Sequence, residues 1–529
     1  VNDRFGDVYG LFYAVAAPGF EDAEIHEISQ FLRRELLTVE GVSDVSLAGL
    51  PEEAVFVMPD MAILSNLGVS PAAIVGQIQA TAEVSQAGSV ASGRRRLTVD
   101  VPQGTDGVQA LAELTVGVGG EVLHLTDIAE VARGRIETPR QIIRFNGREA
   151  FTLGVAGLAS ENIVEVGARV EAKLDALRAD LPFGVELHPI YQQHEVVDAS
   201  SSAFLANLAA SVAIVIVVLA LFMGWRAAVV VGATLLLTVV GTLFFMALAG
   251  IEMERISLGA LIIAMGMLVD NAIVVAEGMQ MKMQAGRSSR EAADEAAGRV
   301  QIPLLGATVI GIMAFAGIGL SPDSTGEFLF SLFAVVGISL LLSWVLALTA
   351  TPLLAHLVFR RGEAEDTAAY DGAVFSAYRR VLRGALAWRR TVLAALVAIT
   401  AVCWWGFGQV EQQFFPDSDA PLFYAHYKLP QGADIRQVAE DLSAAEDWLL
   451  AREDVVSVST FVGGGATRFM LTYSPEESLP SYGQLIVRTA STEGIPRVRG
   501  ALDAFAAEAL PEGEFRTERL AFGPGGGAP

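Results

Sequence analysis

The chain has 529 residues, is 52% hydrophobic and carries a formal net charge of −24. An acidic balance of this size argues against nucleic acid as a partner, because nucleic acids attract basic surfaces. The single cysteine excludes a disulfide framework, and the six scattered histidines show no metal-ligand spacing, so no metal site is expected.

The N-terminal region predicts repeated strand–helix–strand units. The letters LFYA occur at Leu11–Ala14 and again at Leu422–Ala425, each followed by a charged helical stretch and an alternating strand. A third unit of the same order runs from Ala150 to Ile190. Crossovers of this length favour ferredoxin-like split βαβ layers. The repeat therefore predicts α+β subdomains on either side of a central segment, with residues 47–123 as an insert in the first.

Six apolar stretches are long enough to span a bilayer as helices. They are Ala203–Met223, Ala227–Ala249, Ser257–Ala276, Ile302–Leu320, Phe328–Ala350 and Thr391–Val410. Two further stretches, Ser288–Arg299 and Tyr370–Trp388, are typical of interfacial helices on the cytoplasmic side. Loops rich in arginine alternate with acidic loops, which places both flanking α+β regions outside the cytoplasm.

The expected organisation is thus an α-helical transmembrane bundle with α+β domains outside it. The expected segments are residues 1–46 with 124–198 (first α+β subdomain), 47–123 (inserted subdomain), 199–357 (five spans), 358–389 (amphipathic connector), 390–410 (sixth span) and 411–529 (start of a second α+β region).

Asp270 lies in the middle of the third apolar stretch, with Asn271 beside it. A charge at bilayer depth costs at least about 2.5–3.5 kcal/mol, and carboxylates in such positions usually mark ion pathways. Asp270 is therefore a candidate proton or ion site. The alternative is a polar group that holds helices together by hydrogen bonds.

The run Arg255–Met279, RISLGALIIAMGMLVDNAIVVAEGM, resembles the fourth transmembrane helix of resistance-nodulation-division (RND) efflux permeases, and it is most similar to the multidrug, AcrB-like branch. Further segments resemble the same family in the same order: Phe5–Phe12, Phe31–Gly41, Ile142–Phe151, Gly224–Ala227, Ser324–Glu327, Thr349–Leu353 and Gln412–Asp417. The resemblance implies that the family's first transmembrane helix, the start of its first porter domain and its C-terminal half lie outside this sequence.

In that family the helix carries two adjacent carboxylates of a proton relay. The first corresponds to Asp270, whereas the second position is Asn271, so the resemblance implies one titrating group with an amide partner. The family's relay lysine belongs to the half that this sequence lacks, and Lys173, Lys282 and Lys428 all lie outside the apolar stretches. A carboxylate in a low dielectric favours its neutral form, so Asp270 can take up a proton outside and release it inside.

The resemblance also implies a drug-binding cleft lined with phenylalanines. The comparable stretch here reads FVGGGATRFM, with glycines where aromatic residues are expected. Phe461, Phe469 and Met470 remain as apolar candidates for substrate contact, and an ordinary core role is the alternative.

The function implied is proton-driven efflux of small amphiphilic or toxic compounds by a secondary active transporter, not an enzyme, without a cofactor. The family implies a homotrimer in the inner membrane of a Gram-negative bacterium, with a periplasmic adaptor and an outer-membrane channel. One alternative is a metal exporter, because Met265, Met267, Met279, Met281 and Met283 lie on the Asp270 helix and thioethers bind soft Cu(I). Another is a non-transporting receptor or protein-export helper on a related membrane core.

Overall fold

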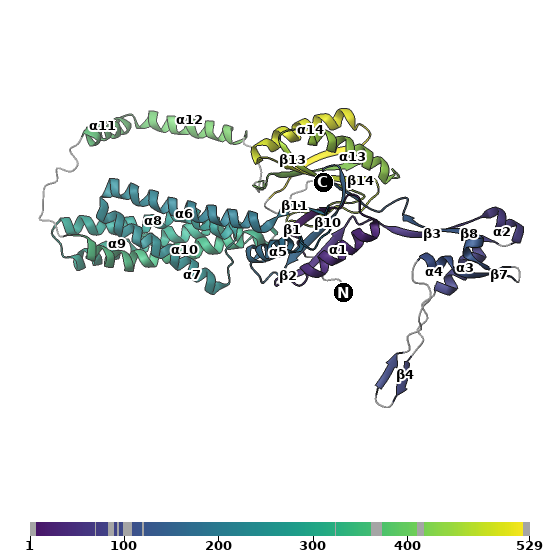
Figure 1. The fold of residues 1–529 in the computed structure, drawn as a ribbon. Helices are drawn as coiled ribbons and strands as arrows, with labels where there is room; N and C mark the ends of the chain where they lie inside the picture. Colours follow the sequence, from purple (N-terminus) through teal and green to yellow (C-terminus); the bar gives the residue numbers. More distant parts are fainter. Residues whose placement is uncertain are drawn as a thin grey trace. The chain divides into compact units, whose positions relative to one another are not determined.

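The computed structural model describes residues 7–68, 70–82, 89–92, 95–98, 108–118, 121–322, 324–360, 373–409 and 417–521. The chain forms two compact units (Figure 1). Residues 1–194 and 419–519 make the first, here named the sheet unit. Residues 195–418 and 520–529 make the second, here named the helical unit. Parts of two segments with family resemblance, residues 5–6 and 412–416, lie outside the described residues.

The N-terminal half of the sheet unit contains two strand–helix–strand units. Their elements are β1 (Leu11–Ala16), α1 (Asp22–Leu36), β2 (Val42–Ala48), β10 (Arg148–Gly157), α5 (Ile163–Leu177) and β11 (Glu186–Gln192). The strands pair in the order β11-β1-β10-β2, all antiparallel. This is the strand order of a ferredoxin-like split βαβ layer. Helix α1 buries Ile25, Ile28, Leu32 and Leu36 at helical spacing against one face of these strands.

The C-terminal half repeats the same arrangement. Its elements are β12 (Leu422–Lys428), α13 (Ile435–Leu450), β13 (Val455–Val462), β14 (Tyr482–Thr489), α14 (Ile495–Ala509) and β15 (Glu514–Arg519). The strand order β13-β14-β12-β15 matches the first half element by element. The second unit of this half, β14–α14–β15, was not among the units expected from the sequence.

A short strand joins the two halves into one nine-stranded sheet. Strand β9 (Ile142–Phe145) turns into β10 through Asn146 and Gly147, which both have positive φ, as a type I′ hairpin turn requires. The other edge of β9 pairs with β13 of the C-terminal half. The sequence stretch IIRFNG therefore links two regions that lie about 300 residues apart in the chain.

The insert leaves the N-terminal half through a two-stranded ladder. Strand β3 (Glu53–Pro59) pairs over its whole length with β8 (Ala129–Arg135), so the insert extends to Arg135 and not only to residue 123. Its remaining described elements are α2 (Met61–Leu67), α3 (Pro71–Ala82), β4 (Ser89–Ser92), β5 (Arg95–Thr98), α4 (Val108–Ala112), β6 (Thr115–Val118) and β7 (Glu121–His124). A small core around Leu64, Ile74 and Leu125 holds the insert together.

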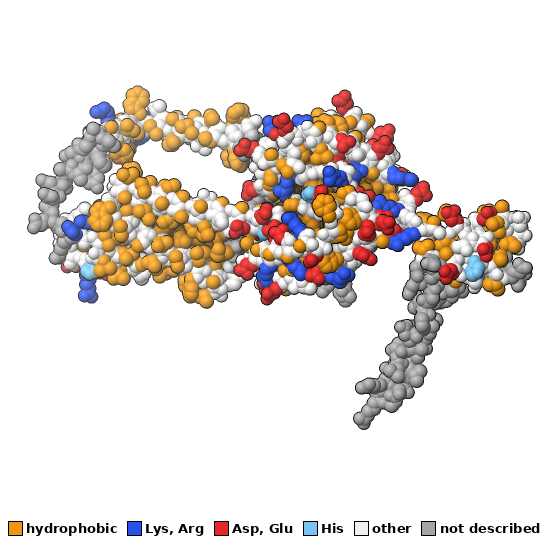
Figure 2. All heavy atoms as spheres, in the orientation of Figure 1, with side chains coloured by type: hydrophobic (Ala, Val, Ile, Leu, Met, Phe, Trp, Pro, Cys, Tyr) orange, Lys and Arg blue, Asp and Glu red, His pale blue; other side chains and the backbone are white. Residues whose placement is uncertain are grey.

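The helical unit contains long apolar helices, six of which are long and apolar enough to cross a membrane within the described residues. The helices are α6 (Gln193–Met223), α7 (Trp225–Ala249), α8 (Arg255–Gln284), α9 (Ser289–Gly319), α10 (Ser324–Val358), α11 (Ala373–Ala387) and α12 (Arg389–Phe407). Figure 2 shows hydrophobic side chains over the visible surface of these helices. Helix α6 begins ten residues before the apolar stretch predicted for it.

One expectation for the helical unit was wrong. Residues 288–299 do not form a separate interfacial helix, because α9 runs without a break from Ser289 through Pro303 to Gly319. Ser288 caps its start by accepting a hydrogen bond from the Glu291 N–H. Because its start is capped and the following residues are helical, α9 begins more than three turns before the apolar stretch predicted from Ile302.

Candidate functional site

Asp270 lies on a face of α8 that the other described helices leave uncovered. The exposed positions of this helix recur every three or four residues and form a stripe: Ile263, Gly266, Asp270, Val274, Glu277 and Met281. The opposite face, with Leu261, Ala264 and Leu268, packs in the core of the helical unit. Helix periodicity thus separates a buried face from a stripe that is apolar at most positions and carries a carboxylate at its centre.

Asn271 points the other way. Its side chain is 6% exposed, and its Nδ2 donates to Ser343 Oγ of α10 at 3.3 Å. Ser343 in turn donates to the Leu268 carbonyl at 2.8 Å. Among the described residues no hydrogen bond joins Asn271 to Asp270, because neighbouring helix positions point about 100° apart. The part of Asn271 in the relay stays a prediction. Asn271 ties α8 to α10.

The Asp270 carboxylate has no hydrogen bond or ion pair with any of the residues that the structure describes. Lys282, the lysine on the same helix, pairs with Glu295 of α9. A group in this position can change between its charged and neutral forms without breaking a contact within the chain. That property suits a carrier better than a structural clamp.

Phe461 and Phe469 lie in an aromatic cluster on the face of the sheet that carries no helix. Side chains alternate along strands, so Phe12 and Phe461 point away from the helix-packed residues that flank them. The Phe12 ring stacks on Phe461 at a centroid distance of 6.2 Å and on Phe469 at 5.8 Å. Tyr191 and Tyr473 contact Phe469 from its two sides. The cluster draws side chains from both halves of the sheet unit.

The three predicted substrate residues differ in exposure. Phe461 and Phe469 are completely buried, whereas Met470 is partly exposed. One buried polar atom on the neighbouring strand β14, Gln484 Nε2, has no hydrogen-bond partner among the described residues. Gln484 Oε1 is occupied, because it accepts from Tyr473 at 2.9 Å and from the Ala466 N–H. The region therefore combines aromatic surface with unused hydrogen-bonding capacity.

Sequence reasoning missed a buried ion pair where the two halves meet. Glu446 of α13 is fully buried and accepts from Arg144 Nε of β9 at 2.9 Å and from the Gly147 N–H at 2.6 Å. Arg144 also donates to the Ala439 carbonyl at 3.0 Å. The signal in the sequence was a lone Glu among the apolar positions of an amphipathic helix. Its partner could not be found by spacing, because it comes from the other half.

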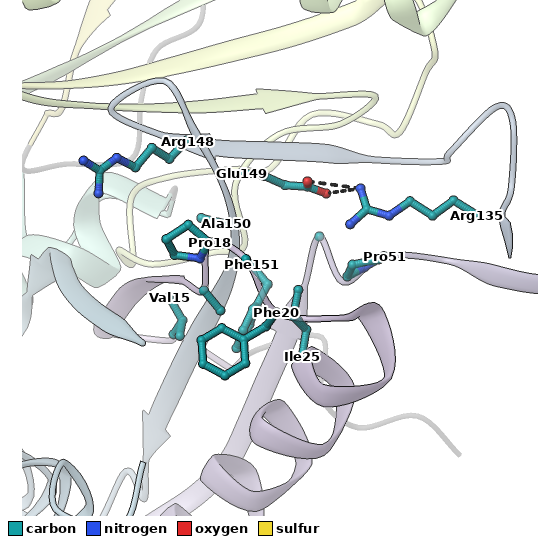
Figure 3. Close-up of a pocket in the computed structure, with 13 residues that line it drawn as sticks. Val15, Pro18, Phe20, Ile25, Pro51, Arg135, Arg148, Glu149, Ala150 and Phe151 are labelled. Carbon is teal, nitrogen blue, oxygen red and sulfur yellow. Dashed lines mark hydrogen bonds and ion pairs between the residues drawn. The ribbon is translucent and has the colours of Figure 1, made fainter. Parts of the chain in front are cut away.

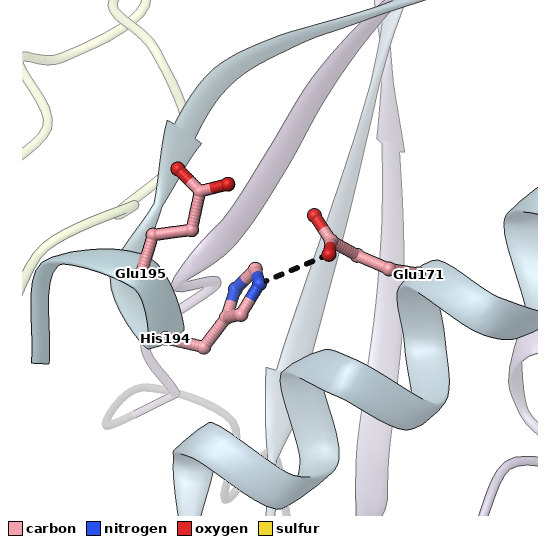
Figure 4. Close-up of side chains that lie close together, drawn as sticks. All are labelled: Glu171, His194 and Glu195. Atoms are coloured by element: carbon pink, nitrogen blue, oxygen red, sulfur yellow. Dashed lines mark ion pairs between the residues drawn. The ribbon is translucent and has the colours of Figure 1, made fainter. Parts of the chain in front are cut away.

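A second polar group lies at the end of β11. Figure 4 shows Glu171, His194 and Glu195 close together, with possible ligand atoms within 4.8 Å of one another. His194 Nε2 lies 3.4 Å from the Glu171 carboxylate, and Gln192 donates to the other oxygen of that group. The imidazole lies directly against Gly167 of α5, where a Cβ atom would come within 2.2 Å of it. These contacts hold the His194 imidazole, at the end of this segment of the sheet unit, against α5.

Comparison with known proteins shows which family the chain resembles. The model of the AcrB/AcrD/AcrF family matches residues 11–474. The multidrug resistance protein MdtC of Yersinia enterocolitica is 27% identical over 470 residues, which cover 86% of this chain and 45% of that protein. The MdtC proteins of Yersinia pestis and Yersinia pseudotuberculosis match over the same extent at the same identity.

The chain thus spans about half the length of the curated relatives it matches. The matched region includes the Asp270 helix, the aromatic cluster and the ion pair between the two halves. The family consists of transporters and not of enzymes, and its members are inner-membrane proteins. This chain belongs to the AcrB/AcrD/AcrF family of RND multidrug efflux permeases.

Proposed function

We propose that the protein drives efflux of small amphiphilic compounds with the proton motive force, and that Asp270 carries the proton. The observation that supports this most is the position of Asp270 at the centre of the uncovered stripe of α8. An ionised carboxylate facing lipid is costly, so the stripe favours either a protein partner or a protonated acid. A group that alternates between these two conditions is a proton carrier.

The energy source follows from the same position. Moving one proton across 100 mV releases about 2.3 kcal/mol. Protonation removes the carboxylate's need for a charged partner, so a helix that packs against the stripe in the full-length protein is free to shift. Because Asn271 is held by Ser343, this part of α8 offers one titrating group and one fixed anchor. We infer a relay in which Asp270 moves a single proton while the α8–α10 contact stays closed.

The relatives contain a second half that this chain does not match. We expect the partner of ionised Asp270 to lie in the corresponding part of the full-length protein. Gly266 precedes Asp270 by one turn on the stripe and is exposed, so a further helix can approach closely there. A lysine or arginine on that helix would stabilise the charged form of Asp270. The assembly implied by the family, a homotrimer with a periplasmic adaptor and an outer-membrane channel, belongs to the same proposal and is tested by cross-linking of the full-length protein.

For the substrate, we infer that amphiphiles bind at the aromatic cluster. Phe461 and Phe469 are sealed from solvent in this conformation, so substrate entry requires the cluster to open. Met470 lies at its edge and is the expected first contact, since a flexible thioether adapts to ligands of different shape. In this proposal the sheet unit lies in the periplasm. Substrate is therefore captured outside the cytoplasm and exported from there.

The test uses the full-length protein in proteoliposomes with an imposed pH gradient. Asp270→Asn should abolish both dye efflux and the coupled proton flux, while Asp270→Glu should retain part of each. Glu277→Gln is the matched control, because Glu277 occupies the same stripe two turns later and should leave both rates nearly unchanged. Dye efflux that survives in Asp270→Asn, with normal expression and assembly, would refute the carrier role.

The metal-exporter alternative is less well supported by the structure. Met265, Met279 and Met283 are buried in the core of the helical unit, and Met281 lies on the exposed stripe. The buried thioethers therefore contribute to packing, and Met281 points outward. Copper export by the same proteoliposomes would favour the metal-exporter alternative. The absence of both dye and copper flux would favour the non-transporting receptor or protein-export helper.

A further inference from the structure

The sheet unit contains a half-open pocket that none of the candidate site residues discussed above lines. Its volume is about 400 Å³, within the range of about 300–1,000 Å³ typical of small-molecule sites. It lies between the end of β1, the start of α1, β10 and the two strands that lead to and from the insert (Figure 3). Phe20, Ile25, Pro51 and Phe151 supply apolar walls.

The polar side of the pocket carries Arg135 and Glu149, and Arg135 also pairs with Asp22, which is not one of the lining residues. Arg135 donates from Nε to Asp22 at 2.7 Å and from Nη1 to both oxygens of Glu149 at 2.8 and 3.1 Å. Two carboxylates and one guanidinium leave one formal negative charge in this group. Hydrogen bonding to Arg135 lowers the pKa of Asp22, so that carboxylate stays ionised at neutral pH.

The second arginine does not cancel this charge. Arg148 also lines the pocket, but Figure 3 shows its guanidinium pointing away from the Glu149–Arg135 pair. It lies 3.5 Å from the Glu186 carboxylate, so its charge is balanced elsewhere. The Glu149 side chain is 57% exposed, and its oxygens can therefore accept a further hydrogen bond from a ligand.

We propose that this pocket binds small cationic amphiphiles, with the apolar body against Phe20, Ile25 and Phe151 and a protonated amine at Glu149. Phe20 is partly exposed, so its ring offers apolar surface to a ligand. An anionic amphiphile of the same shape meets the surplus negative charge and binds more weakly. The site is separate from the aromatic cluster and does not depend on proton transport.

The test compares two probes that differ only in the charge of their head group, 4-hexylbenzylamine and 4-hexylbenzoate. The full chain is placed in lipid nanodiscs with Cys403→Ser, which removes the native thiol, and with Ala17→Cys as reporter. Ala17 lines the pocket and is 8% exposed, so a ligand should shield it. The amine is expected to slow labelling by a small methanethiosulfonate reagent at least fivefold, and the benzoate less than twofold.

Glu149→Gln should weaken protection by the amine about tenfold. Glu161→Gln is the matched control, an arginine-paired glutamate of the same unit that does not line the pocket, and it should have no effect. If Ala17→Cys does not fold, Pro51→Cys reports from the opposite wall. Equal protection by both probes, no protection by either, or protection that survives Glu149→Gln would overturn the proposal. Adding Asp270→Asn should leave the protection intact, which separates this site from the proton carrier.

Discussion

Two acids in this protein, Glu446 and Asp270, have opposite environments. Glu446 is enclosed by the sheet unit and receives hydrogen bonds from Arg144 and the Gly147 N–H, so its charge is fully matched within the chain. Asp270 lies on an open stripe of the helical unit and has no matching group among the described residues. Glu446, which stabilises the fold, has a charged partner within the chain, whereas Asp270 has none among the described residues. The presence or absence of such a partner distinguishes a structural acid from a candidate proton carrier.

The largest effect is expected at the matched acid. Glu446→Ala leaves the partly buried Arg144 without its carboxylate partner, and breaking a buried ion pair costs about 3–5 kcal/mol. Chemical unfolding of the sheet unit, followed by tryptophan fluorescence of Trp448 on the same helix, measures this loss. Asp270→Asn is the contrasting variant and should leave the same unfolding curve within error. A loss as large in Asp270→Asn would remove the distinction between the two acids.

A smaller cost is expected where α6 begins. Gly167→Ala places a methyl group within 2.2 Å of the His194 ring, and overpacking of this kind costs about 1–3 kcal/mol. The double variant Gly167→Ala with His194→Ala should recover most of the lost stability, because the ring that clashes is gone. Thermal unfolding of the three variants tests the contact. Equal stability of Gly167→Ala and the wild type would show that the imidazole lies elsewhere.

A still smaller effect is expected at Asn271. Asn271→Ala removes one hydrogen bond to Ser343, and such bonds between membrane helices are worth on average about 0.6 kcal/mol. The variant should therefore lower the thermal stability slightly and retain most proton-coupled efflux. Complete loss of efflux in Asn271→Ala, with normal stability, would make Asn271 a second member of the relay and would sharpen the contrast with Asp270.

The smallest effect is a pH dependence in the sheet unit. Burial lowers the pKa of His426, so the unfolded chain binds this proton more readily than the folded chain. The contribution of neutral His426 to folding stability is complete above the pKa of the unfolded chain, about 6.5. It is lost as the pH falls through the lower pKa of the folded chain. Melting temperatures between pH 8 and pH 5 should fall less steeply in His426→Gln than in the wild type. Parallel curves would contradict the assignment.

Local patterns in the sequence were enough to predict most elements. The apolar stretches are long and continuous, so the six long helices followed from length alone, and the LFYA repeat correctly marked β1 and β12. Two errors came from local reasoning. The charges of residues 288–299 suggested a separate helix, but the helix continues through them. The insert was predicted to end at residue 123, but it continues to the end of β8. Strand β8 pairs with β3 some 75 residues earlier, and a local pattern does not reveal a pairing over that separation.

The sequence by itself determined that a carboxylate lies inside an apolar helix, that α+β repeats flank the helices, and that the chain resembles one family of efflux permeases. Those conclusions need only residue order, since helix length and strand alternation are local properties. The tertiary structure alone decided which way each polar side chain points: Asp270 outward, Asn271 toward Ser343, and Glu446 toward Arg144. Direction and partnership depend on contacts between segments far apart in the chain, and no local pattern contains them.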